Sequence, residues 1–143
     1  MNIAELIIDL YTNLLFFIKK ISQKNNLSSS QLLCIFAIPN EGISQSDLAK
    51  ILCLDLSTLS RNLDKLIIKK IVRKESSKSD YRKQNIFLTN KGEKIHLLLL
   101  NDLNVLLQQL NGWDNQANED FDLIISNLSQ FNWLLHKNRY INV

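Results

Sequence analysis

The sequence contains very few of the residues that interrupt helices, with one proline and three glycines in 143 residues. Proline removes a backbone donor and glycine loses backbone entropy in a helix, so their scarcity favours long helices. Leucine and isoleucine outnumber valine, a preference typical of helices rather than strands. The composition therefore predicts a mainly α protein, and the length predicts a single domain over residues 1–143.

Long apolar runs, metal-ligand clusters and catalytic motifs are also missing. No apolar run approaches the roughly 18 residues of a membrane span, and the N-terminus lacks the basic region of a secretory signal. We therefore expect a cytoplasmic protein without a membrane partner. His96 and His136 have no partner at the i,i+4 spacing of zinc motifs. No phosphate-binding glycine loop or nucleophile elbow is present, so we expect neither an enzyme nor a metal or cofactor.

Cysteine is scarce, and both cysteines are predicted to be small buried hydrophobic residues. Cys34 lies within an apolar stretch, and Cys53 lies between Leu52 and Leu54. Cys53 is also the one cysteine close to the candidate reading helix described next. A thiol-based redox switch at Cys53 therefore remains an alternative function.

Residues 44–69 have the pattern of two short helices joined by a tight turn at residues 52–54. Ser44 and Asp47 have the spacing of a capping box, and Asp55 is a favourable N-cap for the second helix. This arrangement is typical of a helix-turn-helix, in which the second helix reads the major groove of DNA. The apolar residues that we expect to be buried are Leu48, Ile51 and Leu52 in the first helix and Leu56, Leu59, Leu63 and Leu66 in the second.

The opposite face of the second helix has the composition of a DNA-reading surface. Small hydroxyl side chains allow close approach, and the fork of Arg61 matches O6 and N7 of guanine. An ordinary amphipathic surface helix is the alternative, but the helix-turn-helix pattern favours DNA. The residues of this helix that we expect to contact DNA are Ser57, Thr58, Ser60, Arg61, Asn62 and Lys65.

A basic hairpin is predicted after these helices, with strands at residues 71–76 and 84–88 and a polar loop at residues 77–83. Ile86 and Leu88 alternate as in a half-buried strand. A solvated hairpin would show the same pattern, but cations on a protruding hairpin also suit a wing that contacts the DNA backbone or minor groove. The basic residues of this candidate wing are Arg73, Lys74, Lys78, Arg82 and Lys83.

Positive charge is concentrated in this central segment. Residues 40–92 contain 11 Lys and Arg against 6 Asp and Glu, whereas the rest of the chain has 6 against 8. The net charge of +3 therefore understates the local excess.

Three motifs in register resemble those of the MarR (multiple-antibiotic-resistance regulator) family of winged-helix repressors. They are Ser57-Thr-Leu-Ser-Arg61, Asp80-Tyr-Arg82 and Leu88-Thr-Asn-Lys-Gly92. The resemblance implies a winged helix-turn-helix over residues 28–92, with Asp80 holding Arg82 at the minor groove. It also implies that residues 1–24 and 93–143 form dimerisation helices. The chain departs from the family at Lys70, where a glycine usually ends the recognition helix.

The terminal segments are consistent with a dimer on their own pattern. Ile3, Ile7, Leu10 and Leu14 recur at alternating steps of four and three, as in a helix seam. Residues 97–110 and 121–135 add further leucine-rich helix, more than a small reading domain can cover. Such patches indicate a partner surface, and a second copy is the simplest partner.

The sequence thus predicts a homodimeric regulator that binds a pseudo-palindromic operator in double-stranded DNA. The resemblance adds the expectation of a repressor relieved by a small-molecule effector. A winged-helix module that binds protein instead of DNA is the alternative from another class. The sequence leaves open the operator, the effector and the direction of regulation.

Overall fold

The structure is a computed structural model that describes residues 2–76, 84–109 and 119–139. The chain divides into two compact units, Met1–Asn104 and Val105–Val143. A single domain over residues 1–143 therefore remains a prediction. In chain order, the described elements are α1 (Ile3–Lys24), α2 (Ser29–Ala37), β1 (Ile43–Ser44), α3 (Gln45–Leu52), α4 (Leu56–Ile68), β2 (Val72–Ser76), β3 (Gln84–Leu88), α5 (Asn90–Gln108) and α6 (Glu119–Lys137).

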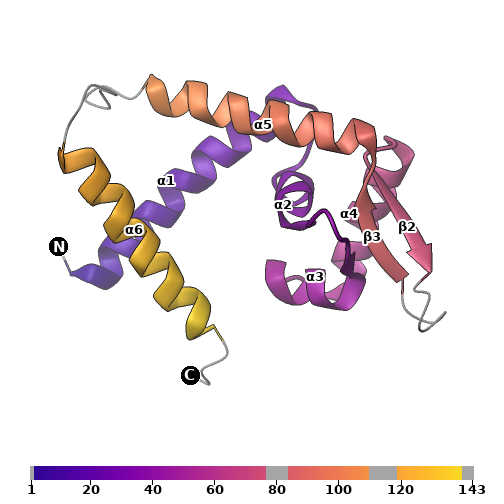
Figure 1. Ribbon diagram of the computed structural model, residues 1–143, viewed down its shortest axis with the longest axis horizontal. Coiled ribbons are helices and arrows are strands. Elements are labelled where there is room, and N and C mark those ends of the chain that lie inside the picture. The colour runs from indigo at the N-terminus through magenta and orange to yellow at the C-terminus, as the bar shows by residue number, and fades with distance from the viewer. Residues whose placement is uncertain (1, 77–83, 110–118, 140–143) are drawn as a thin grey trace. The chain divides into compact units, whose positions relative to one another are not determined.

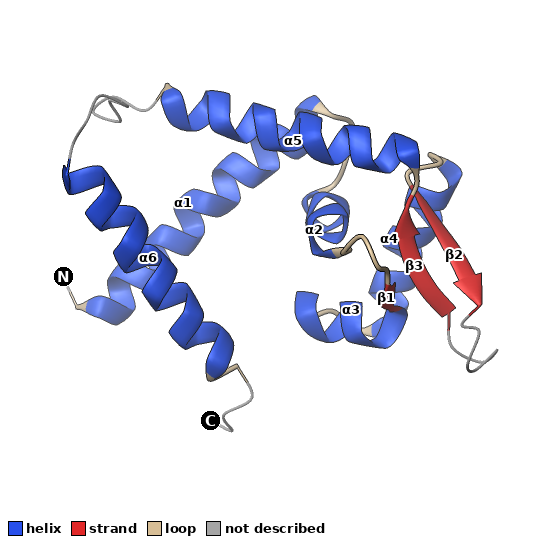
Figure 2. Cartoon of the chain, in the orientation of Figure 1, coloured by secondary structure: helices blue, strands red, loops and turns tan. Residues whose placement is uncertain are grey.

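The mainly helical fold with a small β wing is confirmed (Figures 1 and 2). The strands form one antiparallel sheet in the order β1-β3-β2. The predicted hairpin is β2 and β3, in which Val72 pairs with Leu88 and Ser76 with Gln84. The sequence did not predict β1, whose two residues pair Ile43 with Ile86. The φ angle of +80° at Gly42 lets the chain turn into β1 against the Phe87 ring, where a Cβ would lie 2.4 Å from Phe87 Cε1.

One hydrophobic core joins α2, α3, α4 and the sheet to the end of α1 and the first half of α5. Leu59, Leu63 and Leu66 have no exposed surface, which confirms three of the four leucines predicted for the buried stripe of α4. Each such side chain adds about 1.5–3 kcal/mol through removal of apolar surface from water. Among the described residues of the core, Cys34, Ile35, Leu48, Ile86 and Leu99 also have no exposed surface.

Three residues predicted to be buried are exposed. Leu56 is 56% exposed because it begins α4 and its side chain lies beyond the core. Ile51 is 38% exposed because the buried face of α3 centres on Leu48 and Ala49. Cys53 is exposed because it occupies the turn after α3 in a left-handed conformation, with φ of +52°. Only Cys34 is the buried cysteine that the sequence predicts, and burial raises the pKa of its thiol to about 11.

Three helices end in the same motif without glycine. Asn26, Cys53 and Lys70 have φ of +55°, +52° and +59° after α1, α3 and α4. At Lys70, the backbone N–H donates to Ile67 O at 2.8 Å, and the next N–H, of Ile71, donates to Leu66 O at 2.9 Å. These bonds form a Schellman motif, which offsets the left-handed strain of about 1–2 kcal/mol for a non-glycine residue. Lys70 therefore ends the helix as the usual glycine would.

The Leu-Thr-x-x-Gly motif joins the end of α4 to the start of α5. Ile71 O accepts bonds from Thr89 N at 3.0 Å and Thr89 Oγ1 at 3.1 Å. Thr89 Oγ1 shares its single proton between Ile71 O and Lys70 O, which is closer at 2.7 Å, and it accepts from Gly92 N at 3.1 Å. Gly92 lies so close to this junction that a Cβ would be 2.1 Å from Ile71 O.

A polar clamp joins the end of α1 to α5 within the first unit. Lys24 Nζ donates to Asp102 Oδ1 at 2.6 Å, and Asn25 Nδ2 donates to Asp102 Oδ2 at 2.9 Å. The Asn25 bond and then the Lys24 bond hold the pKa of the Asp102 carboxyl below its ordinary value.

We predict that Gly92→Ala lowers the free energy of unfolding by roughly 1–3 kcal/mol, because the new methyl group would displace the Ile71 carbonyl. Urea unfolding followed by circular dichroism measures this loss. Glu93→Ala changes the exposed neighbouring residue and should shift stability by no more than about 0.5 kcal/mol. Equal midpoints for the two variants would contradict the close approach.

We predict that Asp102→Asn costs about 1 kcal/mol at pH 7, a low value for a charged hydrogen bond because Lys24 is exposed. The folded pKa of Asp102 is depressed, so its contribution is present above the unfolded pKa of about 3.9 and is lost as pH falls through the folded pKa. Unfolding curves should therefore differ between parent and variant at pH 7, and the difference should shrink as pH falls through the depressed folded pKa of Asp102. Glu41→Gln removes an exposed acid as the control. A difference independent of pH would refute the ionic clamp.

Candidate nucleic-acid interface

The polar face of α4 is accessible, as the sequence predicts. Burial of the leucine stripe leaves Ser57, Arg61 and Lys65 exposed on the other side of the helix. Within the described part of the chain, neither Arg61 nor Lys65 has an ion pair. Their positive charges therefore remain available for an anionic partner. The three other candidate contacts, Thr58, Ser60 and Asn62, are half-buried.

The first turn of α4 is ordered around Asp55. The Asp55 carboxylate accepts the Thr58 backbone N–H at 2.8 Å, as expected of an N-cap. It also accepts the Ser57 hydroxyl at Oδ1 and the Thr58 hydroxyl at Oδ2, the latter at 2.7 Å. These bonds, the Ser57 bond first, hold the pKa of the Asp55 carboxyl well below its usual range. The sequence predicted the cap but missed that two candidate DNA contacts bind the capping side chain.

The two described cations of the wing contact other parts of the protein. The Arg73 guanidinium donates to Glu75 Oε1 at 2.7 Å and to Leu88 O at 2.6 Å, and its centre lies 4.9 Å from the Phe87 ring centroid. Arg73 thus braces β2 against β3. Its contact with DNA stays a prediction.

The second wing cation links the sheet to the recognition helix. Lys74 Nζ lies 3.7 Å from Asp64 Oδ1 of α4, and the Lys74 side chain is 22% exposed. This ion pair links the middle of β2 to the polar face of α4. A phosphate contact by Lys74 also stays a prediction. The other candidate wing residues, Lys78, Asp80, Arg82 and Lys83, lie outside the described residues.

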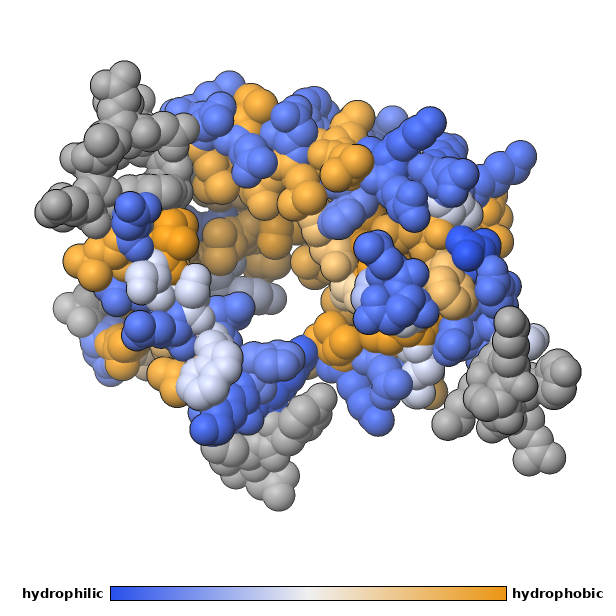
Figure 3. All heavy atoms as spheres, viewed as in Figure 1, coloured by the Kyte–Doolittle hydropathy of each residue, from blue (hydrophilic) through white to orange (hydrophobic). Residues whose placement is uncertain are grey.

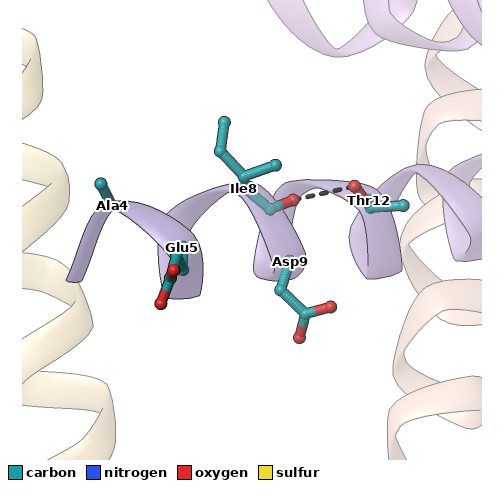
Figure 4. Close-up of a pocket in the computed structure, with 5 residues that line it drawn as sticks. All are labelled: Ala4, Glu5, Ile8, Asp9 and Thr12. Carbon is teal, nitrogen blue, oxygen red and sulfur yellow. Dashed lines mark hydrogen bonds between the residues drawn. The ribbon is translucent and has the colours of Figure 1, made fainter. Parts of the chain in front are cut away.

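Hollows occur in the described surface, among them one along α1 and one at the ends of three helices. Ala4, Glu5, Ile8, Asp9 and Thr12 line one along α1 (Figure 4), where Thr12 Oγ1 donates to Ile8 O at 2.8 Å. We assign no binding site there, since one side of a single helix cannot enclose a ligand.

The second hollow is a cavity of about 280 Å³ at the junction of three helices. Its lining includes the apolar side chains of Leu27, Ile71, Ile95 and Leu98, of which Leu98 is partly exposed. Lys69 and Lys91 lie at its edge and donate to the end carbonyls of α1 and α4: Lys69 Nζ to Asn26 O, and Lys91 Nζ to Lys69 O at 2.8 Å.

Two other kinds of site are absent from the parts of the chain that the structure describes. No group of three His, Cys, Asp or Glu side chains could hold a metal ion in residues 2–76, 84–109 and 119–139. None of the helices in those ranges is long and apolar enough to cross a membrane.

Comparison with known proteins finds a family model that matches part of the chain and solved structures of similar fold. Residues 27–83 match the family model of the MarR family. MarR from E. coli, in its apo form, is 21% identical over 96% of each chain, with a TM-score of 0.73. A MarR transcriptional regulator from Methanosarcina mazei is 22% identical over 94% of this chain and 96% of its own, with a TM-score of 0.75.

A third similar structure contains DNA. It is a mutant of MepR from S. aureus bound to an oligodeoxyribonucleotide, 21% identical over 94% of this chain and 99% of its own, with a TM-score of 0.62. No curated protein matches the sequence. At these identities the solved structures establish the fold.

Proposed function

We propose that this chain, which belongs to the MarR family of winged-helix regulators through residues 27–83 and through its fold, is a homodimeric, sequence-specific DNA-binding regulator of transcription. A regulator of this family is not an enzyme. The observation that carries the proposal is the exposed polar face of α4, with two cations that have no ion pair among the described residues. Helix α4 would enter the major groove, and the wing would reach the adjacent minor groove.

The roles of the individual side chains follow from their chemistry. Arg61 would contact guanine through its planar fork, and Lys65 would contact a phosphate as a point charge. Lys78 and Lys83 would add phosphate contacts from the wing, and Asp80 would hold Arg82 at the minor groove. Arg73 would support the hairpin from within, because its guanidinium contacts Glu75 and Leu88.

A second copy of the chain is proposed as the partner of the terminal helices. On α1, the seam residues Ile3, Ile7, Leu10 and Leu14 are 37–69% exposed, whereas Ile21 near the end of the helix is 4% exposed. Apolar residues also lie on the surface of α5 (Figure 3), with Leu97 65% exposed and Leu98 49% exposed. Exposed apolar area on this scale supports an obligate interface. Two-fold symmetry would place two α4 helices at half-sites about 10 bp apart.

Repression relieved by an effector is the finer part of the proposal. The cavity at the ends of α1 and α4 offers a place where a small molecule could shift the reading helix relative to α5. Such a ligand acts only through its different affinity for the two arrangements. Calorimetric titration of candidate ligands against the parent and Lys91→Met would test this location.

The two alternatives from the sequence make different predictions. A winged-helix module for protein binding would bind random duplex weakly and with little salt dependence, whereas a DNA reader shows a steep logarithmic slope. Cys53 is exposed, although the sequence predicts that it is buried. An oxidant can therefore reach its thiol, and this accessibility supports the redox alternative. A peroxide response that survives Cys53→Ser would exclude that cysteine as the sensor.

We predict that Arg61→Ala costs roughly 1–3 kcal/mol of operator affinity and relaxes the preference at one base pair. Lys65→Ala should instead weaken binding to all duplexes similarly and reduce the salt slope by about one. Fluorescence anisotropy at several salt concentrations measures both effects. If Arg61→Ala binds the operator as tightly as the parent does, α4 does not read the DNA bases through Arg61.

We predict that Leu14→Glu raises the dimer dissociation constant roughly 100-fold or more, because both copies would place a charge in the apolar seam. Leu14 is 48% exposed in the single chain, so its own unit should remain folded. Phe16→Glu adds the same charge to α1 on the side away from the seam, at a residue that is 64% exposed. Sedimentation equilibrium should show dissociation for the first variant and much less for the second. Identical sedimentation of parent and Leu14→Glu would rule out this seam.

A further inference from the structure

We infer that Asp55 determines base preference at the start of the recognition helix, by fixing the Ser57 and Thr58 hydroxyls as hydrogen-bond acceptors. The inference rests on the proposed function, because it assigns a chemical preference to α4 within DNA. The sequence predicts only one role for Asp55, that of an N-cap for the recognition helix.

The geometry brings three side chains of one turn together. Asp55 Oδ1 accepts the Ser57 hydroxyl, and Asp55 Oδ2 accepts the Thr58 hydroxyl at 2.7 Å. The Thr58 backbone N–H, at 2.8 Å from Oδ1, fixes the carboxylate in place. Asp55 and Ser57 are exposed and Thr58 is half-buried, and the three residues lie one turn before the exposed Arg61 on α4.

The direction of these hydrogen bonds follows from the chemistry of the groups. An ionised carboxylate has no proton to give, so both bonds must use the hydroxyl protons. The Asp55 carboxyl is ionised at neutral pH, since the ordinary pKa of an aspartate is already about 3.9 and these bonds lower it further. Each hydroxyl has a single proton, and once that proton is donated only the oxygen lone pairs remain. In this arrangement Ser57 and Thr58 can accept a hydrogen bond from a partner but cannot donate one.

Acceptors on this turn select among the groups that the major groove presents. Cytosine N4 and adenine N6 are donors, whereas guanine O6, guanine N7 and thymine O4 are acceptors. Hydroxyls bound to Asp55 therefore favour cytosine or adenine at the base that they face. They also cannot donate to a phosphate oxygen, and the Asp55 charge repels one.

Arg61 supplies the opposite chemistry one turn further along the same face. Its guanidinium has only donors, which match the acceptors of guanine. Ser57 and Arg61 are four residues apart, or about 6 Å along the helix axis. Helix α4 thus presents acceptors in its first turn and donors in its second, which gives the reading surface a direction.

Selection from a random duplex pool tests this inference with the full-length chain. The parent should select an amino-bearing base, cytosine or adenine, at a position next to the one read by Arg61. Asp55→Asn keeps an N-cap oxygen but has an amide group that frees at least one hydroxyl proton. Its preference for that base should fall about three- to tenfold relative to the parent. Its affinity for random duplex should rise a few-fold, because a negative charge near the phosphates is removed.

Three further variants make the outcome specific. Glu41→Gln removes an exposed acid outside α4 that has no hydrogen bond to the hydroxyls, so it should keep the base preference. Ser57→Ala with Thr58→Val removes both acceptors and should lose the preference as Asp55→Asn does. If Asp55→Asn fails to fold, Asp55→Ser retains a cap without the carboxylate and takes its place.

The results separate this inference from the proposed function. A parent that selects the amino-bearing base and an Asp55→Asn variant that does not would support the inference. A parent that binds duplex with a normal salt slope while Asp55→Asn keeps the same preference would overturn the inference alone. A parent without salt-dependent duplex binding would overturn the proposed function and this inference with it.

Discussion

The carbonyl group of Ile71 is the contact on which the reading unit depends. It accepts the backbone and side-chain donors of Thr89, and Gly92 allows α5 to approach it without a Cβ. Three elements meet at this point, since Ile71 follows α4, precedes β2 and binds the start of α5. A displacement here would tilt α4 and the wing together. A few hydrogen bonds around the Ile71 carbonyl therefore hold α4 and α5 at a fixed angle to each other.

The accuracy of the sequence-based prediction differs between elements, and each difference has a physical cause. Helices with side-chain caps and regular leucine spacing were placed within a residue or two, as Asp55 and α4 illustrate. The exposure of Leu56 was missed because periodicity gives the direction of a side chain but not where the core ends. Strand β1 was missed because its two residues acquire their structure from pairing with β3. Cys53 was missed because a left-handed turn redirects a side chain that apolar neighbours had marked as buried.

The candidate interface was harder to predict than the fold, because sequence gives charges without their partners. Residues 40–92 carry an excess of cations, but several of those cations serve internal contacts in the structure. Arg73 braces the hairpin through Glu75 and Leu88, and Lys74 pairs with Asp64. Arg61 and Lys65 are the same residue types as Arg73 and Lys74, but they lie on the surface without an ion pair among the described residues. Composition therefore located the basic region, and only the fold separates structural cations from those available to a partner.

The exposure of α1 gives the strongest physical argument for a second copy. The helix belongs to the same unit as the reading head, yet its seam is buried only near its end, where Ile21 packs into the core. Toward the N-terminus the same repeat continues at Leu14, Leu10 and Ile3, which are 48%, 41% and 69% exposed. If the apolar seam of α1 packed only against the winged helix-turn-helix, it would not need to continue beyond the residues that contact it. The continuation is accounted for if a second surface covers it, and a symmetric copy of the chain supplies a surface of the same kind.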